Sequence, residues 1–229
     1  ESRYAVEHDT MDTTFRSMYL GLSAFLDANA ERRELLLGQR PPRFDSSFEE
    51  AIALAGDDFE RVALKAEAAR DYFLLVGPPG TGKTSRALRR MVEHFYAASS
   101  MQILLLAYTN RAVDEICQSL SSITPDIDYI RVGSELSCDV RFRGHLLENI
   151  LAECNSRREV NIRMTDCRVY VGTVASIAAK AELFKLKRFD VAIVDEATQI
   201  LEPQLLGVLC AKFADERNAV GKFILIGDH

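Results

Sequence analysis

Two periodicities of apolar residues divide the chain near residue 71. Before that point apolar side chains recur at helical spacing, most clearly in a stripe of Phe15, Met18, Tyr19, Leu22, Phe25 and Leu26. Leu37 followed by Gly38 is typical of a helix end, and Pro41-Pro42 imposes an extended break. We expect residues 1–70 to form a helical scaffold or stalk segment that packs on the rest of the chain.

From residue 71 to residue 229, short apolar runs alternate with segments of helical spacing. The runs that we predict as strands are residues 72–76, 103–107, 129–132, 169–171, 191–194 and 223–226. Several are continuously apolar, which is typical of a parallel sheet covered on both faces. Residues 133–166 are charged and contain one helix-like stretch, so we interpret them as an insertion. The pattern predicts an open α/β domain with its ligand site at the carboxyl ends of the strands.

The first of these strands leads into a glycine-rich octapeptide that fits the pattern G-x-x-x-x-G-K-[ST]. Its residues are Gly77, Pro78, Pro79, Gly80, Thr81, Gly82, Lys83 and Thr84. Gly80 and Gly82 allow the backbone to curl around phosphates, and the amides of the following helix start add positive potential. Lys83 is predicted to reach the β- and γ-phosphates, and the Thr84 hydroxyl to bind Mg²⁺. A strand before the octapeptide and helical spacing after it favour this interpretation over a plain turn.

A second chemical signal lies at the end of the run at residues 191–194, where Asp195 and Glu196 stand side by side. In phosphoryl-transfer ATPases the first such carboxylate holds Mg²⁺ and the second polarises the attacking water. Adjacent carboxylates also occur as solvated turn residues. Their pairing with a phosphate loop about a hundred residues upstream favours the catalytic interpretation.

Composition narrows the class of protein without changing this picture. The chain has 229 residues, 48% of them hydrophobic, and a formal net charge of −6, which argues against wholesale adhesion to nucleic acid but allows a local basic track. No apolar run is long enough to span a membrane. The start has neither Met nor a basic-then-apolar leader, so we expect a piece of a longer protein that is not secreted but cytoplasmic or nucleoid-associated. Five widely spaced cysteines favour reduced buried thiols over a metal site.

Several short strings resemble motifs of the superfamily 1 helicases. Residues 195–199 (Asp-Glu-Ala-Thr-Gln) resemble motif II, 108–114 (Tyr-Thr-Asn-Arg-Ala-Val-Asp) motif Ia, 171–176 (Val-Gly-Thr-Val-Ala-Ser) motif Ic, and 226–229 (Ile-Gly-Asp-His) the start of motif III. Their order and spacing are most similar to the 1B branch, which contains nonsense-mediated-decay RNA helicases and flap-processing nuclease-helicases. The resemblance covers residues 71–229.

This resemblance implies a RecA-like P-loop domain, the first of two motor domains, with ATP at its edge and single-stranded nucleic acid across its top. It implies 5′-to-3′ movement, with DNA favoured over RNA. Lys83, Thr84 and Asp195 then hold phosphates and Mg²⁺, and Glu196 is the general base. Gln199 and Asp228 couple the γ-phosphate to motor movement. The positions matching contacts to nucleic-acid phosphates are Thr109, Asn110 and Thr173, although Thr109-Asn110 is also a good helix cap.

Three departures from the family pattern stand out. The chain stops at His229, before the Gln of motif III, and it lacks the second motor domain of the same polypeptide with its arginine finger. We therefore expect the isolated chain to be inactive or nearly so. Where the family has an adenine-reading Gln, residues 58–61 read Asp-Phe-Glu-Arg, which leaves adenine selectivity open. The basic strings at 157–158 and 185–188 suit a nucleic-acid path or, more commonly, a solvated face.

Three alternatives differ in class. A P-loop ATPase of the clamp-loader or remodelling type needs the same phosphate loop but has no counterpart of motif Ia. A nucleotide-binding module without turnover has no use for Glu196. An RNA-directed helicase remains open, whereas a GTPase is disfavoured because the sequence has no Asn-Lys-x-Asp string.

Overall fold

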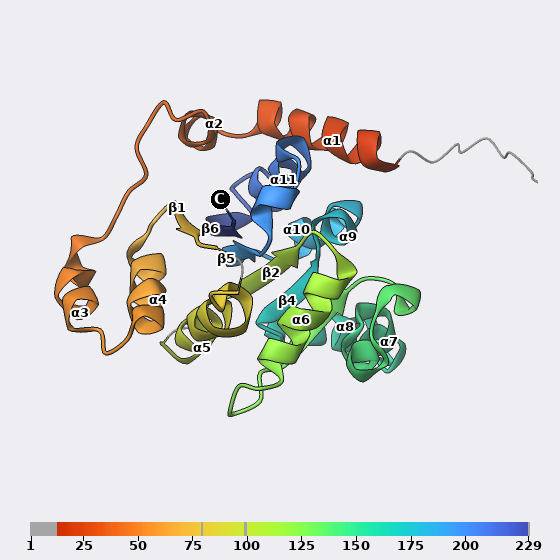
Figure 1. The fold of residues 1–229 in the computed structure, drawn as a ribbon. Coiled ribbons are helices and arrows are strands. Elements are labelled where there is room, and N and C mark those ends of the chain that lie inside the picture. The colour runs from red at the N-terminus through yellow and green to blue at the C-terminus, as the bar shows by residue number, and fades with distance from the viewer. Residues whose placement is uncertain (1–12, 79, 99, 229) are drawn as a thin grey trace, which may run out of the picture.

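The computed structural model describes residues 13–228 except residues 79 and 99. Its centre is a parallel sheet of six strands in the order β1-β6-β5-β2-β4-β3 (Figure 1). The strands are β1 (Tyr72–Val76), β2 (Ile103–Ala107), β3 (Tyr129–Val132), β4 (Val169–Thr173), β5 (Phe189–Val194) and β6 (Val220–Gly227). All six predicted strands are confirmed. The last three are longer than predicted because Gly172, Asp190 and Gly221 break the apolar runs without breaking the pairing.

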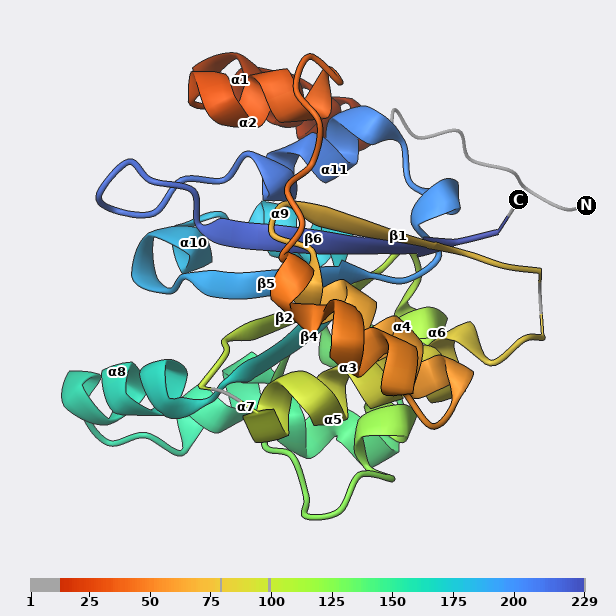
Figure 2. The same ribbon diagram turned by 90° about the vertical axis from the view of Figure 1, so that its left-hand side faces the viewer.

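Helices cover both faces of the sheet, as Figure 2 shows. The α-helices are α1 (Thr13–Asp27), α2 (Ala30–Leu36), α3 (Glu49–Leu54), α4 (Asp58–Ala68), α5 (Arg89–Ala98), α6 (Asn110–Leu120), α7 (Leu147–Ala152), α8 (Arg157–Asp166), α9 (Val174–Ala179), α10 (Glu182–Leu186) and α11 (Glu202–Leu209). Short turns of other helical types are η1 (Ser46–Phe48), η2 (Lys83–Leu88), η3 (Glu135–Ser137), η4 (Val140–His145) and η5 (Ala197–Gln199). These elements and the parallel sheet form a RecA-like α/β fold.

Successive residues of the central strands enter two separate apolar cores, because side chains alternate across a sheet. On β2, for example, Leu105 packs with α4, α5 and α6, whereas Leu104 and Leu106 pack on the opposite face with α9 and α11. Strands β2, β4 and most of β5 are buried, in agreement with the continuous apolar pattern. The edge strand β1 is an exception, with Leu74 53% exposed, because one of its faces lacks full cover among the described residues.

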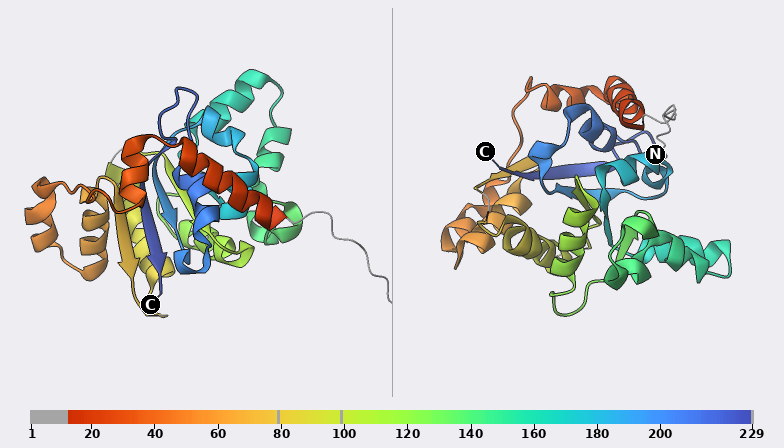
Figure 3. Two further views of the ribbon diagram at one scale, coloured as in Figure 1. Left: turned by 90° about the horizontal axis from the view of Figure 1, so that it is seen from above. Right: turned by 45° about the vertical axis from the view of Figure 1, so that its right-hand side comes forward.

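The segment before the sheet is helical, and it covers parts of both faces. Helix α1 lies across α11 on one face, and α4 packs beside α5 on the other (Figure 3). Asp71, directly before β1, accepts hydrogen bonds from Arg40 and Arg43, and these contacts hold the linking segment of residues 37–45 against the sheet. The two arginines keep the pKa of the Asp71 carboxyl far below its usual range.

Helix α1 is confirmed, but its apolar stripe is not its main packing face. Tyr19 and Leu26 are 75% and 68% exposed. The close contact is made instead by Gly21, where an added Cβ would lie 1.7 Å from the backbone oxygen of Pro203 in α11. The residues 133–166 form η3, η4, α7 and α8 at the β3 edge of the sheet, opposite the edge beside which α3 and α4 lie (Figures 1 and 3).

Candidate nucleotide site and nucleic-acid interface

The phosphate loop joins the end of β1 to η2 and lies at the carboxyl edge of the sheet. Gly80 and Gly82 both have left-handed φ angles, of +79° and +81°, which L-residues with a side chain adopt only with strain. The Thr81 hydroxyl donates to the Pro78 carbonyl at 2.8 Å and braces the loop. Pro79, also predicted to belong to the site, lies outside the described residues.

Lys83 directs its ammonium group into this loop. Nζ donates to the carbonyl oxygens of Gly77 at 2.7 Å and Pro78 at 2.8 Å, and to Asp228 Oδ1 at 2.5 Å. Asp228 directly follows β6, which pairs with β1, so strand order brings it to the loop from 145 residues away. The ammonium is therefore fixed at the point where the phosphates of a nucleotide are expected.

Thr84 and Asp195 meet at the floor of the site. The Thr84 hydroxyl donates to Asp195 Oδ2 at 2.6 Å, although the two residues are 111 positions apart. Asp195 follows β5 and is only 3% exposed, and this burial raises the pKa of its carboxyl, while the Thr84 hydrogen bond lowers it. A hydroxyl and a carboxylate oxygen at this separation are the hard oxygen ligands that suit Mg²⁺.

Glu196 is held in an unusual backbone conformation. Its φ of +52° is left-handed, and its amide donates to Asp195 Oδ1 at 3.0 Å. Such a conformation in a residue with a side chain is strained and recurs at functional sites. Burial, and then the negative charges of Asp195 and Glu115, raise the pKa of the Glu196 carboxyl, and a hydrogen bond with the Gln199 side chain lowers it. Gln199 therefore lies beside the predicted base.

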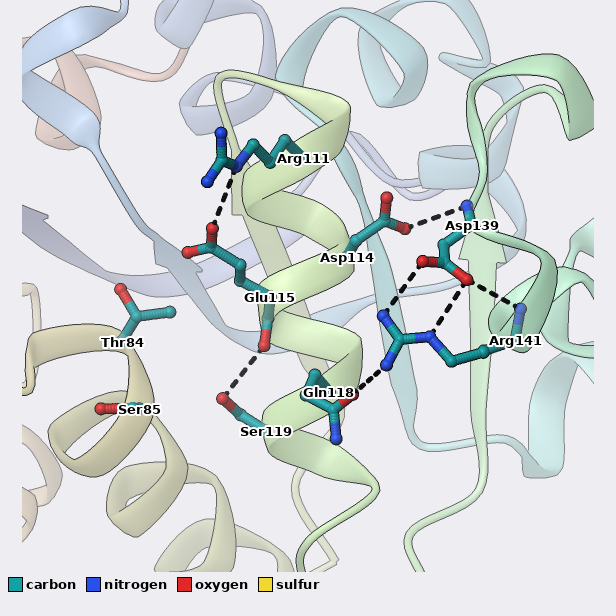
Figure 4. A pocket seen from close by; sticks show the side chains of 9 residues that line it. All are labelled: Thr84, Ser85, Arg111, Asp114, Glu115, Gln118, Ser119, Asp139 and Arg141. Carbon is teal, nitrogen blue, oxygen red and sulfur yellow. Dashed lines mark hydrogen bonds and ion pairs between the residues drawn. The ribbon is translucent and has the colours of Figure 1, made fainter.

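Glu115, on α6, is a residue of this site that sequence reasoning missed. It lines a cavity of about 440 Å³ that opens beside Thr84 and Ser85 and extends along α6 to Asp139 and Arg141 (Figure 4). Its charge raises the pKa of both Asp195 and Glu196. Only its position could have indicated Glu115 as a site residue, because α6 starts at the end of β2, and β2 is the neighbour of β5 in the sheet.

The three residues matched to nucleic-acid contacts lie on the same edge of the sheet, Thr109 and Asn110 after β2 and Thr173 at the end of β4. Thr109 caps α6 by accepting from the amide of Ala112 at 3.1 Å and is exposed, and Asn110 is the first residue of that helix. Thr173 caps α9 but is 5% exposed, with its hydroxyl 2.6 Å from Ser176 Oγ. Because Thr109 is exposed, it can cap α6 and also contact a phosphate. The Thr173 hydroxyl is buried and already hydrogen-bonded to Ser176.

The basic strings divide between exposed and buried positions, and the cysteines are mostly buried. Lys187 is buried, and its ammonium donates to the carbonyls of Met164 and Thr165, so it belongs to the packing of α8. Arg157 and Arg158 are exposed on α8. Four of the five cysteines are buried, and in the described part of the chain no group of three or more His, Cys, Asp or Glu residues could hold a metal ion. Nor is any helix there both long and apolar enough to cross a membrane.

Comparisons with known proteins agree with this geometry. Residues 60–229 match the family model of an AAA domain. The DNA replication ATP-dependent helicase/nuclease JHS1 of Arabidopsis thaliana is 30% identical over 239 residues, which cover 99% of this chain and 17% of that protein. The human DNA replication ATP-dependent helicase/nuclease DNA2 is 30% identical, with 86% of this chain and 19% of that protein covered. The chain thus spans less than a fifth of these relatives.

Among solved structures, the UvsW helicase from bacteriophage T4 superposes with a TM-score of 0.49 and 14% sequence identity, over 80% of this chain and 59% of that chain. The family model covers well over half of the chain and includes the phosphate loop, Asp195-Glu196 and the segment between them. The chain therefore belongs to the AAA domain family, in which it is a first motor domain of the superfamily 1B helicase type.

Proposed function

We propose that this chain is the ATP-binding motor domain of a DNA helicase, and that it couples ATP hydrolysis to 5′-to-3′ movement on single strands. The second motor domain of such a helicase would supply the arginine finger and close over the nucleotide. The helicase names of the relatives support DNA over RNA as the substrate. If the protein is a DNA helicase, it works where DNA is processed, in the cytoplasm or nucleoid.

The observation that carries this proposal is the convergence of four side chains from three adjacent strands. Lys83 and Thr84 follow β1, Asp195 follows β5 and Asp228 follows β6, and two hydrogen bonds of 2.5–2.6 Å link them in pairs. Lys83 would exchange its contact with Asp228 for the β- and γ-phosphates of ATP. Thr84 and Asp195 fit Mg²⁺, which when bound neutralises charge that develops on the phosphates.

We assign the role of general base to Glu196. It lies one position beyond the proposed metal ligand, and its raised pKa makes it a stronger proton acceptor than an exposed glutamate. In this role it takes the proton of the water that attacks the γ-phosphate. Gln199, which hydrogen-bonds this carboxylate, would fix its orientation and sense the γ-phosphate.

For nucleic acid we propose contacts by Thr109, Asn110 and the backbone around Thr173. Thr109 and Asn110 follow β2, which is next to β5 in the sheet, and Thr173 ends β4, which is next to β2. Asp195 follows β5, which lies between β6 and β2, so movement in the nucleotide site can reach the residues after β2 through one strand. We further propose that residues 1–70 serve as scaffold and residues 133–166 as an insertion.

Removing the Lys83 ammonium group tests the proposed nucleotide site. Substituting Lys83 by Ala removes a charge-assisted contact worth roughly 1.5–3 kcal/mol, which corresponds to about tenfold to a hundredfold in affinity. The measurement is a titration of a fluorescent ATP analogue with Mg²⁺ into residues 1–229. The matched control is Lys185→Ala, which removes the same charge from an exposed site on α10. Equal affinities of Lys83→Ala and wild type would refute the nucleotide site.

The leading alternative, a remodelling ATPase that does not move along a strand, differs in its response to oligonucleotide. In the full-length parent protein, helicase function predicts turnover that single-stranded DNA stimulates. It also predicts that replacing Thr109 and Asn110 by Ala lowers this stimulation without changing nucleotide affinity. Turnover indifferent to single strands would favour the remodelling class.

A further inference from the structure

An exposed ion pair at the start of α6 lies beside the nucleotide site. Arg111 Nε is 3.4 Å from Glu115 Oε1, and the two side chains are 90% and 59% exposed. Arg111 comes directly after Thr109 and Asn110, the residues proposed to contact nucleic-acid phosphates. Glu115 lies one turn further along the helix and lines the cavity that opens beside Thr84 (Figure 4). The pair therefore connects the start of α6 with the edge of the nucleotide site.

Glu115 differs from the other carboxylates of this cavity in how it is held. Asp114 contacts Arg131, which is 1% exposed, so that pair is fixed in the core. Asp139 accepts two hydrogen bonds from the guanidinium of Arg141, at 3.1 Å and 3.0 Å. The partner of Glu115, in contrast, is a long and exposed side chain. An exposed ion pair of this kind contributes little to stability, so another anion can readily replace the carboxylate.

The charge of Glu115 acts on the residues proposed to bind Mg²⁺. Burial is the main cause of the raised pKa of the Asp195 carboxyl, and the negative charge of Glu115 contributes to it. The Thr84 hydroxyl donates to Asp195, and Thr84 lines the same cavity as Glu115. A negative charge in this place attracts a dication and repels phosphates, and a cation that neutralises it weakens both effects. Whether Glu115 is paired therefore affects the binding of Mg²⁺.

We propose that Arg111 contacts a phosphate of the bound single strand, and that this contact releases Glu115 to favour Mg²⁺ in the nucleotide site. The inference rests on the proposed function, because it needs a strand at the start of α6 and a nucleotide at the phosphate loop. A guanidinium can bind a phosphate through two parallel hydrogen bonds, which makes the phosphate a stronger partner than the exposed carboxylate. The coupling is reciprocal, so Mg²⁺ with nucleotide strengthens strand binding by the same factor.

The test measures how much Mg²⁺ strengthens nucleotide binding by residues 1–229, with and without a strand. The probe is a fluorescent, non-hydrolysable ATP analogue, titrated once with Mg²⁺ and once with EDTA at low ionic strength. The strand is a single-stranded oligonucleotide at saturating concentration. For wild type, the strand should increase the ratio of the two affinities about two- to fivefold, the range of an exposed ion pair. Because one domain is used, closure of a second domain cannot cause the increase.

Two substitutions separate the phosphate contact from the charge. Arg111→Ala leaves Glu115 without this partner, so the ratio should be raised about two- to fivefold before the strand is added and should not rise further. Glu115→Gln removes the charge, so the ratio should be lower than in wild type and should not respond to the strand. The matched control is Arg89→Ala, which removes the arginine of another i, i+4 pair, with Glu93, and should behave as wild type.

Three results would refute this exchange of partners. They are an unchanged or lowered ratio in Arg111→Ala, a strand that still raises the ratio in Glu115→Gln, and a strand that leaves the ratio of wild type unchanged. In each of these cases the nucleotide still binds, so the proposed nucleotide site stays intact. Wild type that does not bind the analogue with Mg²⁺ or with EDTA would overturn the nucleotide site and the exchange together.

Discussion

At the scale of single residues, the nucleotide site is dominated by negative charge. Asp195, Glu196 and Asp228 follow two neighbouring strands, and Glu115 faces them from α6. Burial and mutual repulsion raise the pKa of Asp195 and Glu196, because both effects disfavour the ionised carboxylate. A bound dication relieves this repulsion, and a proton taken up by Glu196 relieves it as well, so the charge cluster favours both parts of the proposed chemistry.

Removing the charge of Glu115 should therefore change the pH dependence of turnover. Glu196 acts as a base only when it is deprotonated, so a raised pKa places the acid limb of the rate profile at higher pH. Glu115→Gln removes one cause of that raised pKa, so the acid limb should move to lower pH. The measurement is kcat against pH for the full-length parent protein, stimulated by single-stranded DNA.

Two further variants serve as controls for this measurement. Glu148→Gln, an exposed carboxylate of α7 that contacts Lys180, should leave the profile unchanged. Glu196→Gln should bind nucleotide normally but lose turnover at every pH, because an amide cannot accept the proton of the attacking water. An acid limb that stays in place in Glu115→Gln would mean that Glu115 does not act on the base.

At the scale of elements, the strands could be predicted and one packing face could not. Continuous apolar runs mark β1 and β2 at both ends, since burial on two faces leaves little room for polar residues. Helix α1 was also predictable, but the contact that seats it on α11 is made by Gly21, which carries no apolar signal. Tyr19 and Leu26 of the apolar stripe are exposed. Helical periodicity therefore predicts an amphipathic helix, but it does not predict which side of that helix packs against this domain.

Substitution of Gly21 tests that contact. In Gly21→Ala the new Cβ would meet the Pro203 oxygen at 1.7 Å, so α1 must shift or detach from α11. We expect a loss of about 1–3 kcal/mol in unfolding free energy, as for other overpacked sites. Urea denaturation measures the loss, and faster tryptic cleavage after Arg16 in α1 reports detachment.

Gly207→Ala is the control from the other side of the same crossing. Its Cβ would lie 3.6 Å from the nearest atom, Gly21 Cα, which is ordinary contact. Because alanine is favoured over glycine in a helix interior by about 1 kcal/mol, this variant should be neutral or more stable. Equal destabilisation by both substitutions would contradict the seating of α1 through Gly21.

At the scale of the whole molecule, strand order determines which distant residues meet. The phosphate loop was readable because its residues are contiguous, and Asp195-Glu196 because a motif marks them. Glu115 was not, because its place in the site depends on β2 and β5 being neighbours in the sheet. The same order places the strands of the nucleotide site, β1, β6 and β5, beside those of the proposed nucleic-acid contacts, β2 and β4.

This arrangement also bears on whether residues 1–229 can complete phosphoryl transfer alone. Of the arginines nearest to the phosphate loop and to α6, Arg131 is 1% exposed and contacts Asp114, and Arg86 lies over Phe59. Arg111 is 90% exposed on α6 and pairs with Glu115. We therefore assign no arginine finger among these three residues, and a finger accelerates hydrolysis roughly a thousandfold or more.

We expect residues 1–229 alone to bind nucleotide but to hydrolyse it slowly and to unwind no duplex. Affinity for single-stranded DNA should be weak and should fall steeply with salt, because one domain provides only part of the phosphate contacts. An ATPase assay with and without oligonucleotide tests this expectation, and Arg111→Ala tests the most accessible arginine. Brisk turnover that DNA stimulates and that Arg111→Ala abolishes would place a finger on α6. The division of catalysis between two motor domains would then be wrong, because one domain would hold base, metal ligands and finger together.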